Sequence, residues 1–279
     1  MEKNLPELPE VETVRLGLLP ALEGRTINDV VVRRRDLRTP VPENFEDRVR
    51  NQKVLGLSQR SKYILILLES GETIIIHLGM SGRIRIEEGN PCEPDKHDHI
   101  EFITDSRHCI RFGDPRRFGF VDLIQAGQVD LYPSLAKLGP EPLDAAFEGD
   151  VLYDRLKGRQ TTMKAVLMDQ RIIAGLGNIY VNEALFRAGI TPQKKAGSLS
   201  RAQAEKLVKV IKDVLQEAIC AGGSSLKDHR QTDGELGYFQ HSFQVYGREG
   251  ETCLNCQSEI IQRMVQQGRS TFYCSRCQQ

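Results

Sequence analysis

The residues of this chain that could do chemistry begin close to its start, where residues 5–12 are Leu-Pro-Glu-Leu-Pro-Glu-Val-Glu. A proline at a free amino terminus carries a secondary amine that can attack a sugar carbon and form an iminium ion, whereas an internal proline is an amide without a usable lone pair. Met1 to Leu5 precede Pro6 in this sequence. The alternative interpretation treats Pro6 and Glu7 as a turn and a cap ahead of a helix. The position of Pro6 in the mature chain therefore decides between chemistry and structure.

Cysteines in the last 27 residues form a second candidate site. They are Cys253, Cys256, Cys274 and Cys277, and they form two C-x2-C pairs separated by 17 residues. Each pair can supply two ligands to one tetrahedral ion, and disulfides are the weaker explanation in a reducing cytosol. The spacing predicts a zinc site. The remaining three, Cys92, Cys109 and Cys220, are scattered and indicate no chemistry.

Short loop segments combine cationic, apolar and glycine residues. Lys62 stands before an apolar run, residues 77–82 carry a methionine between glycines, and residues 113–119 hold two arginines and an aromatic residue. Each is ordinary alone, as a solvated lysine, a turn and a polar loop. Together they supply the tips that wedge into a duplex and fill the space left by an extruded base. Residues 96–99 could form a metal cluster, although phosphate contact or solvent exposure is the better interpretation.

The composition is that of an ordinary soluble protein whose charges balance. The chain has 279 residues, of which 39% are hydrophobic, and its 38 basic side chains equal its 38 acidic ones. The chain has no run of 18 apolar residues, and its first residues do not show the basic stretch followed by an apolar stretch that is typical of a secretion signal. We therefore expect neither a membrane span nor a secretion signal, and we expect the protein to be cytosolic. Zero net charge argues weakly against a nucleic-acid partner, so any phosphate-binding surface must come from segregation of charge.

The first half of the chain alternates short β-branched runs with turn residues. A helix is expected first, from Pro9 to Leu22, with apolar residues at helical spacing and Gly24 after its end. The expected strands cover residues 30–32, 64–68, 73–77, 83–86, 99–104, 109–112 and 119–124. Strands at this spacing predict a sandwich or a flattened barrel.

The second half changes to helical periodicity after an irregular acidic connection. We expect helices at residues 151–156, 162–167, 178–188 and 199–221. A tight glycine turn at residues 175–178 could offer backbone amides to a phosphate. The long loop at residues 222–237 is of a length that is usually functional. The predicted domains are residues 1–135, 136–243 and 244–279.

Motifs distributed over essentially the whole chain match one known family in order. They are residues 5–12, 60–63, 77–82, 96–99, 114–119, 175–180, 222–228 and 245–248, followed by the cysteine segment. In these motifs the chain resembles bacterial formamidopyrimidine-DNA glycosylase. The resemblance implies a multidomain α+β fold, with an N-terminal β-sandwich and flanking helix, a helix-two-turn-helix domain and a C-terminal zinc ribbon.

The resemblance also implies an activity and a partner. The protein would be a base-excision-repair DNA glycosylase and abasic-site lyase that removes 8-oxoguanine and formamidopyrimidines by Schiff-base chemistry with β,δ-elimination. Its partner would be double-stranded DNA containing oxidised bases or abasic sites. It would act as a monomer in the bacterial cytoplasm, at the nucleoid.

Individual roles follow from the resemblance for the catalytic residues. Pro6 would be the Schiff-base nucleophile at the sugar C1′, Glu7 the acid that assists departure of the base, and Glu10 would organise the site. Lys62 would transfer protons during β-elimination. Arg269 would grip a phosphate and assist δ-elimination.

The resemblance implies DNA-binding roles for a further set of residues. Those that fill the helical void would be Met80, Arg116 and Phe118, and those that contact phosphate or DNA would be His97, Arg159, Lys164 and Asn178. The loop around Lys227 would close over the everted purine. The single zinc ion would be structural, because four thiolates leave no open coordination position.

Some features depart from the family pattern. Leu5 stands where an initiator methionine would expose the proline, and we expect a start site assigned four codons early at a leucine codon such as TTG. The ribbon has one residue more than is usual between its cysteine pairs. His229 and Arg230 stand where apolar residues are more usual.

Two alternatives to this function remain open. One is a relative that binds damaged DNA without cutting it, blocked by its own first residues. Glu7, Glu10 and Lys62 argue against it, because binding alone needs none of them. The other is an enzyme with endonuclease VIII specificity for oxidised pyrimidines.

Overall fold

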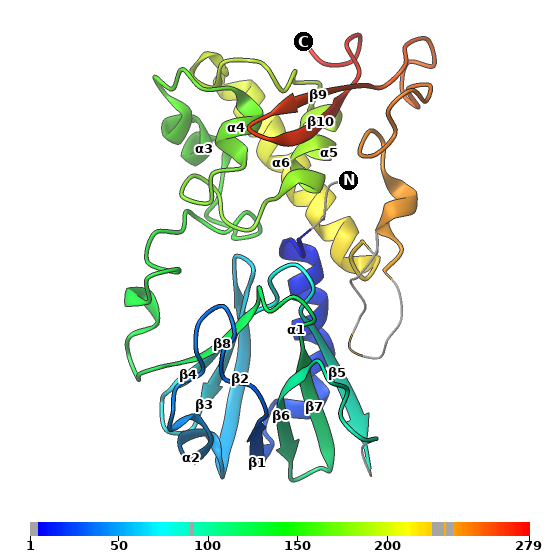
Figure 1. Cartoon of the computed structure of the whole chain (residues 1–279). Helices are drawn as coiled ribbons and strands as arrows, with labels where there is room; N and C mark the ends of the chain where they lie inside the picture. The colour runs from blue at the N-terminus through cyan, green and yellow to red at the C-terminus, as the bar shows by residue number, and fades with distance from the viewer. Residues whose placement is uncertain (1–4, 90–91, 225–231, 233–236) are drawn as a thin grey trace. The chain divides into compact units, whose positions relative to one another are not determined.

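The computed structural model describes residues 5–89, 92–224, 232 and 237–279, which form two compact units (Figure 1). The strand-rich unit consists of Leu5–Ala136 and Ala221–Tyr238, and the helix-ribbon unit of Lys137–Cys220 and Phe239–Gln279. The division into three domains stays a prediction. In the described part of the chain, no helix has the length and apolar content needed to cross a membrane.

An eight-stranded antiparallel sheet dominates the strand-rich unit, in the order β5-β7-β6-β1-β2-β3-β4-β8. Its strands are β1 (Thr26–Val32), β2 (Gln52–Arg60), β3 (Tyr63–Leu68), β4 (Thr73–His77), β5 (Arg83–Glu88), β6 (Asp98–Thr104), β7 (His108–Gly113) and β8 (Phe120–Ile124). Strands β1 and β2 pair only at Thr26 with Lys53 and Ile27 with Gln52. Because this junction is so short, the sheet divides into two halves, and the predicted sandwich is confirmed.

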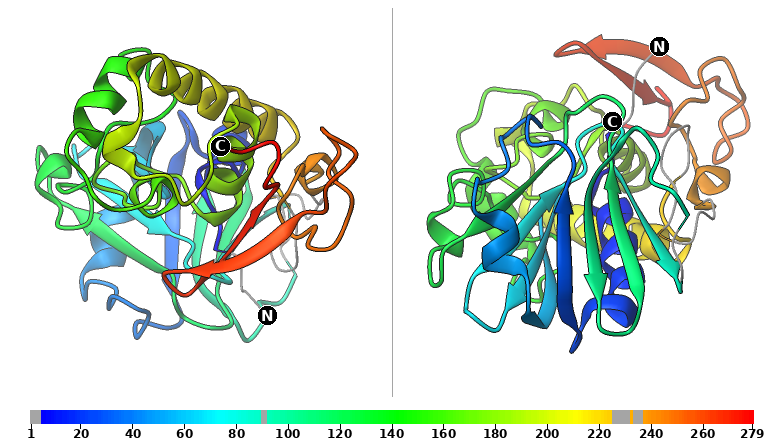
Figure 2. Two further views of the ribbon diagram at one scale, coloured as in Figure 1. Left: turned by 90° about the horizontal axis from the view of Figure 1, so that it is seen from above. Right: turned by 60° about the horizontal axis from the view of Figure 1, so that its bottom comes forward.

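Helix α1 (Leu8–Leu22) forms the centre of the core of this unit. Val14, Leu18 and Leu22 follow helical spacing and are buried against strands of both halves. Figure 2 shows the helix lying along the strands. Pro9 occupies the first turn, where its missing N–H costs nothing, so the sequence-based helix is confirmed to within one residue.

Two elements of this unit were not expected from the sequence, strand β2 and the short helix α2 (Phe45–Val49). Val54 and Leu57 are buried in β2, but Gly56 and the surrounding polar residues hide the apolar pattern. Strand β2 forms its ladder with β3, which was expected. A central strand can therefore have a weak sequence signal when its neighbour supplies most of the apolar side chains.

The helix-ribbon unit contains the expected helices and hairpin. Its elements are α3 (Gly149–Leu156), α4 (Met163–Leu167), α5 (Asn178–Ala188), α6 (Arg201–Cys220), β9 (Gln262–Gln266) and β10 (Arg269–Tyr273). Three 3-10 turns complete the described chain at Val129–Leu131, Ala196–Ser198 and Phe239–Ser242. Helix α6 begins at Arg201 because Ser200 and Gln203 cap it, the Ser200 N–H donating to Gln203 Oε1 over 3.1 Å.

A chain of aromatic contacts joins α5 to the cysteine ribbon inside this unit. The participating rings are, in order, Tyr180, Phe239, Phe243, Tyr246 and Phe272, with successive centroids 5.1–5.8 Å apart. Rings at these distances bury large apolar areas and favour tilted or edge contacts. The ribbon is therefore packed on the helices and not held by the cysteines alone.

Candidate active site

The start of helix α1 holds two buried carboxylates, one at Glu7 directly after Pro6 and one at Glu10. Glu7 is the N-cap and Glu10 the third helical residue of a capping box, and their side chains belong to residues only 4% and 2% exposed. Glu10 Oε2 accepts the Glu7 N–H over 2.9 Å. Its other oxygen, Oε1, accepts both the N–H and the hydroxyl of Ser224 over 2.8 Å. One carboxylate therefore joins the residue after Pro6 to the beginning of the long loop.

The turn that carries Lys62 is fastened to the same end of α1. Gln59 Nε2 donates to the carbonyl oxygens of Leu8 over 2.8 Å and of Ser61 over 3.0 Å. Ser61 has a positive φ of 55°, which lets the chain reverse between β2 and β3. The structure thus brings Pro6, Glu7 and the Lys62 turn together within the strand-rich unit.

His77 also belongs to this neighbourhood, although it was not expected from the sequence to be a site residue. Its Nδ1 accepts the Gly79 N–H over 3.1 Å, and its ring lies against Tyr63 and Phe120, with centroids 4.9 and 5.7 Å away. Burial lowers the pKa of His77 to about 4, helped by the charges of Arg38 and Lys62. The ring is therefore neutral at pH 7, with its proton on Nε2. The detectable signal was a histidine that ends an apolar strand directly before a glycine-rich turn.

The loops predicted to fill a helical void meet at Asp114. Its Oδ1 accepts the hydroxyl of Ser81 over 2.5 Å, and its Oδ2 accepts the Gly119 N–H over 2.7 Å. Gly79 has a φ of 63°, and a Cβ there would lie 2.4 Å from the backbone N of Gly119. The two loops consequently pack backbone against backbone.

Met80, Arg116 and Phe118 lie on these joined loops. The Arg116 guanidinium stands 4.6 Å from the centre of the Phe118 ring, and Phe118 is exposed. Met80 is half-buried. Phe118 therefore presents an exposed aromatic ring with a cation over its face, and the contact of this tip with a duplex stays a prediction.

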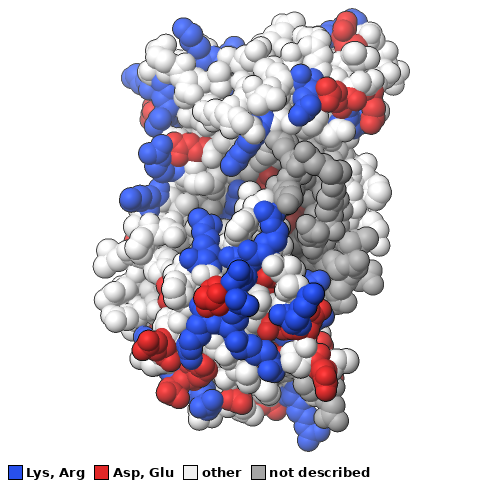
Figure 3. Space-filling view, viewed as in Figure 1, with Lys and Arg blue, Asp and Glu red and all other residues white. Residues whose placement is uncertain are grey.

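His97 lies beside a hollow of about 490 Å³ in the strand-rich unit. The residues that line this hollow include Arg33, Arg34, Arg35 and Lys96. The three arginines pair with carboxylates at 2.5–3.1 Å, which tempers their charge. Figure 3 shows lysine and arginine side chains gathering over this unit in the lower half of the view. The balanced total charge is thus unevenly distributed over the surface.

In the helix-ribbon unit, Arg269 and Lys164 line one hollow of about 340 Å³. Arg171, Gln266 and Gln267 also line it, together with Asp169, which pairs with Arg171 over 2.8 Å, so its walls carry more cationic than acidic groups. Asn178 begins α5 and donates from Nδ2 to the Ser270 carbonyl oxygen over 3.1 Å. Lys164 and Asn178 are therefore neighbours of the hairpin strand β10, which begins at Arg269.

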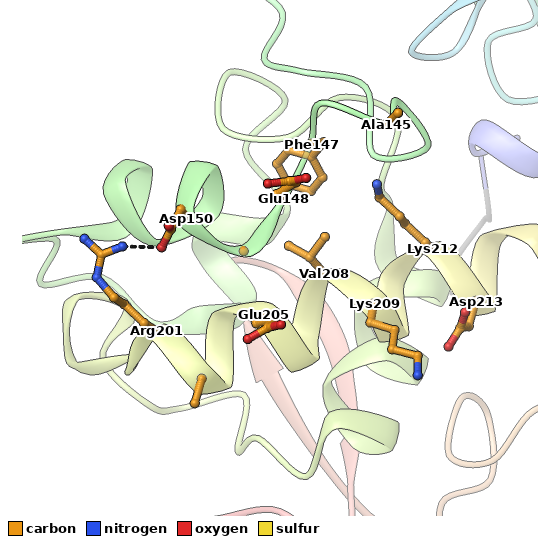
Figure 4. A pocket seen from close by; sticks show the side chains of 12 residues that line it. Ala145, Phe147, Glu148, Asp150, Arg201, Glu205, Val208, Lys209, Lys212 and Asp213 are labelled. Atoms are coloured by element: carbon orange, nitrogen blue, oxygen red, sulfur yellow. Dashed lines mark hydrogen bonds and ion pairs between the residues drawn. The ribbon is translucent and has the colours of Figure 1, made fainter.

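Other predicted residues lie elsewhere. Arg159 is exposed in the loop after α3, where its Nε donates to the Arg155 carbonyl oxygen over 2.7 Å. Lys227 lies outside the described residues. A further hollow of about 660 Å³ between residues 145–150 and α6 is lined by mixed charges and by none of the predicted residues (Figure 4).

The four ribbon cysteines form a compact cluster. Their Sγ atoms all lie within 4.8 Å of one another. Thiolates bound at ~2.3 Å to one tetrahedral ion stand roughly 3.8 Å apart. The Sγ atoms of Cys253 and Cys277 are 3.8 Å apart, as are those of Cys256 and Cys274. The cluster could therefore hold a metal ion.

These features define an α+β protein in which a β-sandwich presents buried carboxylates beside a proline and a helical unit carries a four-cysteine ribbon. The family model of the formamidopyrimidine-DNA glycosylase N-terminal domain matches residues 5–121, and that of the formamidopyrimidine-DNA glycosylase H2TH domain matches residues 138–230. The chain belongs to the formamidopyrimidine-DNA glycosylase family. The resemblance recognised from the sequence is confirmed.

Individual relatives agree over nearly the whole chain. The formamidopyrimidine-DNA glycosylases of Azorhizobium caulinodans and Cereibacter sphaeroides are 52% and 55% identical, over 98% of this chain and 100% of each relative. The crystal structure of the Thermus thermophilus Fpg protein is 40% identical, with a TM-score of 0.86 and 98% of both chains covered. A Lactococcus lactis Fpg variant in complex with Fapy-dG-containing DNA is 34% identical, with a TM-score of 0.89 over 98% of this chain and 100% of that one.

Proposed function

We propose that this chain excises oxidised purines from double-stranded DNA with the ring nitrogen of Pro6 as the nucleophile. Its family makes it a base-excision-repair DNA glycosylase with abasic-site lyase activity. The observation that carries the proposal is the position of Glu7, a buried carboxylate that follows Pro6 directly and whose backbone is fixed by Glu10 over 2.9 Å. The family match begins at residue 5, so Pro6 is the second residue matched.

The chemistry proceeds in two bond changes at C1′. The Pro6 nitrogen forms a bond to C1′ of the damaged nucleotide as the bond from C1′ to the base nitrogen breaks, and the proton lost from the Pro6 nitrogen leaves with the base. Glu7 assists this departure as the acid of the site, and its proton then goes to O4′ as the C1′–O4′ bond opens and leaves the iminium. An α-amino group has an ordinary pKa of about 8, so its lone pair is available near neutral pH. The resulting iminium makes the C2′ proton acidic, and its removal, with Lys62 in proton transfer, breaks the C3′–O bond.

DNA binding in this proposal uses both units. Met80, Arg116 and Phe118 would fill the space left by the extruded nucleotide, because their loops are joined at Asp114 and present an exposed ring and a cation. Arg269 and Asn178 would contact phosphate beside β10. His97 and Arg159 would add contacts, and Lys227 would lie over the purine, as in the family pattern.

The cysteine cluster would hold one structural zinc ion. Four thiolates suit Zn²⁺ and leave no position open for substrate, and the sulfur spacings of 3.8 Å fit a tetrahedron. The ion would stabilise the ribbon that presents Arg269. As an enzyme of chromosomal DNA repair, the protein would work at the bacterial nucleoid.

Borohydride trapping on a duplex with an abasic site tests the nucleophile. We compare the 279-residue chain, a chain that begins at Pro6, and that shorter chain with Pro6→Ala. The chain beginning at Pro6 should give a covalent adduct that mass spectrometry locates on residue 6. The Pro6→Ala variant keeps a primary amine at the same position and should give much less adduct, and the same chain with its terminal nitrogen acetylated should give none at residue 6. Equal trapping by the 279-residue chain with residues 1–5 intact would overturn the assignment.

The lesion class has a separate test. Excision of 8-oxoguanine opposite cytosine should exceed excision of thymine glycol opposite adenine by the same enzyme. A preference for thymine glycol would support the endonuclease VIII alternative, and binding without excision would support the damage-binding one. Neither alternative is favoured by the family to which the chain belongs.

A further inference from the structure

Lys164 is an unusual lysine because it is almost completely buried. The residue is 2% exposed, although the sequence analysis assigned it to phosphate or DNA contact. Its Nζ donates to the Ser270 carbonyl oxygen over 2.6 Å and to the Thr271 hydroxyl over 2.7 Å. Both acceptors follow Arg269 directly in β10. Taking an ammonium group out of water costs free energy, and these two hydrogen bonds offset part of that cost.

The hydrogen bonds continue from Lys164 across the hairpin. The Thr271 hydroxyl, which accepts from Lys164, donates to Gln266 Oε1 on β9 over 3.0 Å. Thr271 is fully buried, and Gln266 lines the same hollow as Arg269. A charged donor polarises the hydroxyl and strengthens its bond to the next acceptor. The ammonium therefore influences both strands of the hairpin.

Helix α5 holds the neighbouring backbone of β10 in the same way. The Phe272 N–H donates to Asn182 Oδ1 over 2.8 Å, and Asn178 Nδ2 shares the Ser270 carbonyl oxygen with Lys164. Asn182 is itself buried and donates to the Asn178 carbonyl oxygen over 2.5 Å. Consecutive residues of β10 are thus fixed by side chains of α4 and α5, while Arg269 at the end of the strand stays exposed.

We propose that Lys164 is a positioning residue that holds β10 so that Arg269 faces the 340 Å³ hollow. This inference rests on the proposed function, because it concerns the phosphate grip of Arg269. It differs from a direct phosphate contact by Lys164, in which the two cations would act independently. The two arrangements predict different double-mutant behaviour, since only residues that act through one another are non-additive.

The test measures binding to a duplex with a reduced abasic site at several salt concentrations. Lys164→Met keeps the length and burial of the side chain and removes the ammonium group. It should weaken binding about tenfold and reduce the slope of log affinity against log salt by about one, as Arg269→Ala should. The double variant should bind like Arg269→Ala alone. Additive loss, with the slope reduced by about two, would overturn the inference in favour of direct contact.

Product analysis and controls separate positioning from a general loss of structure. Lys164→Met should lower the ratio of δ- to β-elimination product, as Arg269→Ala should, while the yield of trapping at Pro6 with saturating duplex and the zinc content are unchanged. An unchanged product ratio would contradict the inference. Lys209→Met, at an exposed lysine of α6, is the matched control and should bind like the parent protein.

A second variant serves if Lys164→Met does not fold. Thr271→Val is nearly isosteric, removes the hydroxyl acceptor and leaves the ammonium in place. It should shift the product ratio in the same direction by a smaller factor, and no shift would count against the inference. Failure of the proposed function itself would be recognised separately, because the parent chain beginning at Pro6 would then give no adduct.

Discussion

The start of helix α1 and the hairpin strand β10 each present a residue with a proposed catalytic role, but they are held in opposite ways. At α1, Glu10 fixes the backbone of Glu7 across three positions of the chain. At β10, the partners Lys164 and Asn182 are 106 and 90 residues away from the groups that they hold. The first arrangement is a local capping motif, whereas the second exists only after the helices and the ribbon have packed.

The difference has a consequence for how each region tolerates change. A capping box forms whenever the helix forms, so substitutions there should affect chemistry more than folding. Buried polar groups of the helix-ribbon unit lose their partners together, so substitutions there should affect folding or the position of Arg269. Substitutions in the two regions and a change of pH can test this contrast.

Replacing Glu7 with Gln should have the largest effect, because it removes the proposed acid and keeps the shape of the side chain. Excision of 8-oxoguanine should fall by a factor of about 10²–10⁴, the usual contribution of general acid catalysis. The free energy of unfolding should change by less than about 1 kcal/mol. Single-turnover excision and urea unfolding measure the two quantities.

Glu12→Gln is the matched control for Glu7→Gln. Glu12 pairs with Arg15 over 2.7 Å on the half-buried side of the same helix. Its loss should leave excision unchanged. If Glu7→Gln instead unfolded the protein without a specific loss of excision, α1 would not be the locally built site described here.

Glu183 should show the opposite behaviour, with a large effect on stability. Its fully buried carboxylate accepts the backbone N–H groups of Gln244, Val245 and Tyr246 over 2.9–3.0 Å. Glu183→Leu leaves three backbone donors without this acceptor, and the two in the buried residues Val245 and Tyr246 should cost about 1–3 kcal/mol each, for a total of about 2–6 kcal/mol. Glu183→Gln keeps one oxygen for two of these donors and should cost about 1–3 kcal/mol.

Hydrogen exchange of amides 244–246 and urea unfolding measure these losses. Glu217→Leu is the control, since Glu217 forms an exposed ion pair with Arg187 and should cost less than about 1 kcal/mol. Equal costs for the variants at positions 183 and 217 would remove the contrast between the two regions.

Acidic pH should lower the stability of the strand-rich unit, because His77 is buried there in its neutral form. Its pKa is about 4 in the folded protein and 6.5 ordinarily, so between these values the unfolded chain binds more protons. Stability from this group is therefore complete above pH 6.5 and is lost as pH falls towards 4, by at most about 3 kcal/mol. His77→Gln should flatten this part of the profile of unfolding free energy against pH. An unchanged slope would show that the ring is not held neutral.

The smallest effect is expected at Ser224, which anchors the beginning of the long loop to Glu10. Ser224→Ala removes the hydroxyl that donates to Glu10 Oε1 but keeps the backbone N–H to the same oxygen. Binding of a duplex that retains its damaged base should weaken about fivefold, equivalent to about 1 kcal/mol. Binding of an abasic duplex should change less. Equal losses for both duplexes would indicate that the anchor does not serve the loop in particular.

Features that depend on residues close together in the chain could be predicted from the sequence, and those that depend on distant partners could not. The α1 helix, the paired cysteines and the strands β3 and β4 have signals within a few residues, and the structure contains them. The burial of Lys164 has no such signal, because a lysine in a short amphipathic helix usually faces water. Its acceptors are backbone and hydroxyl groups of a distant strand. Similarly, the burial of His77 becomes visible only in the folded chain, where Tyr63 and Phe120 pack against its ring.

Gly79 has a further consequence for the two joined loops. A Cβ at this position would collide with the Gly119 backbone at 2.4 Å, so the loops touch without intervening side chains. The ordering entropy of both loops is then lost once, during folding, and not at each encounter with a duplex. Met80, Arg116 and Phe118 would thus meet DNA as one rigid, preorganised group.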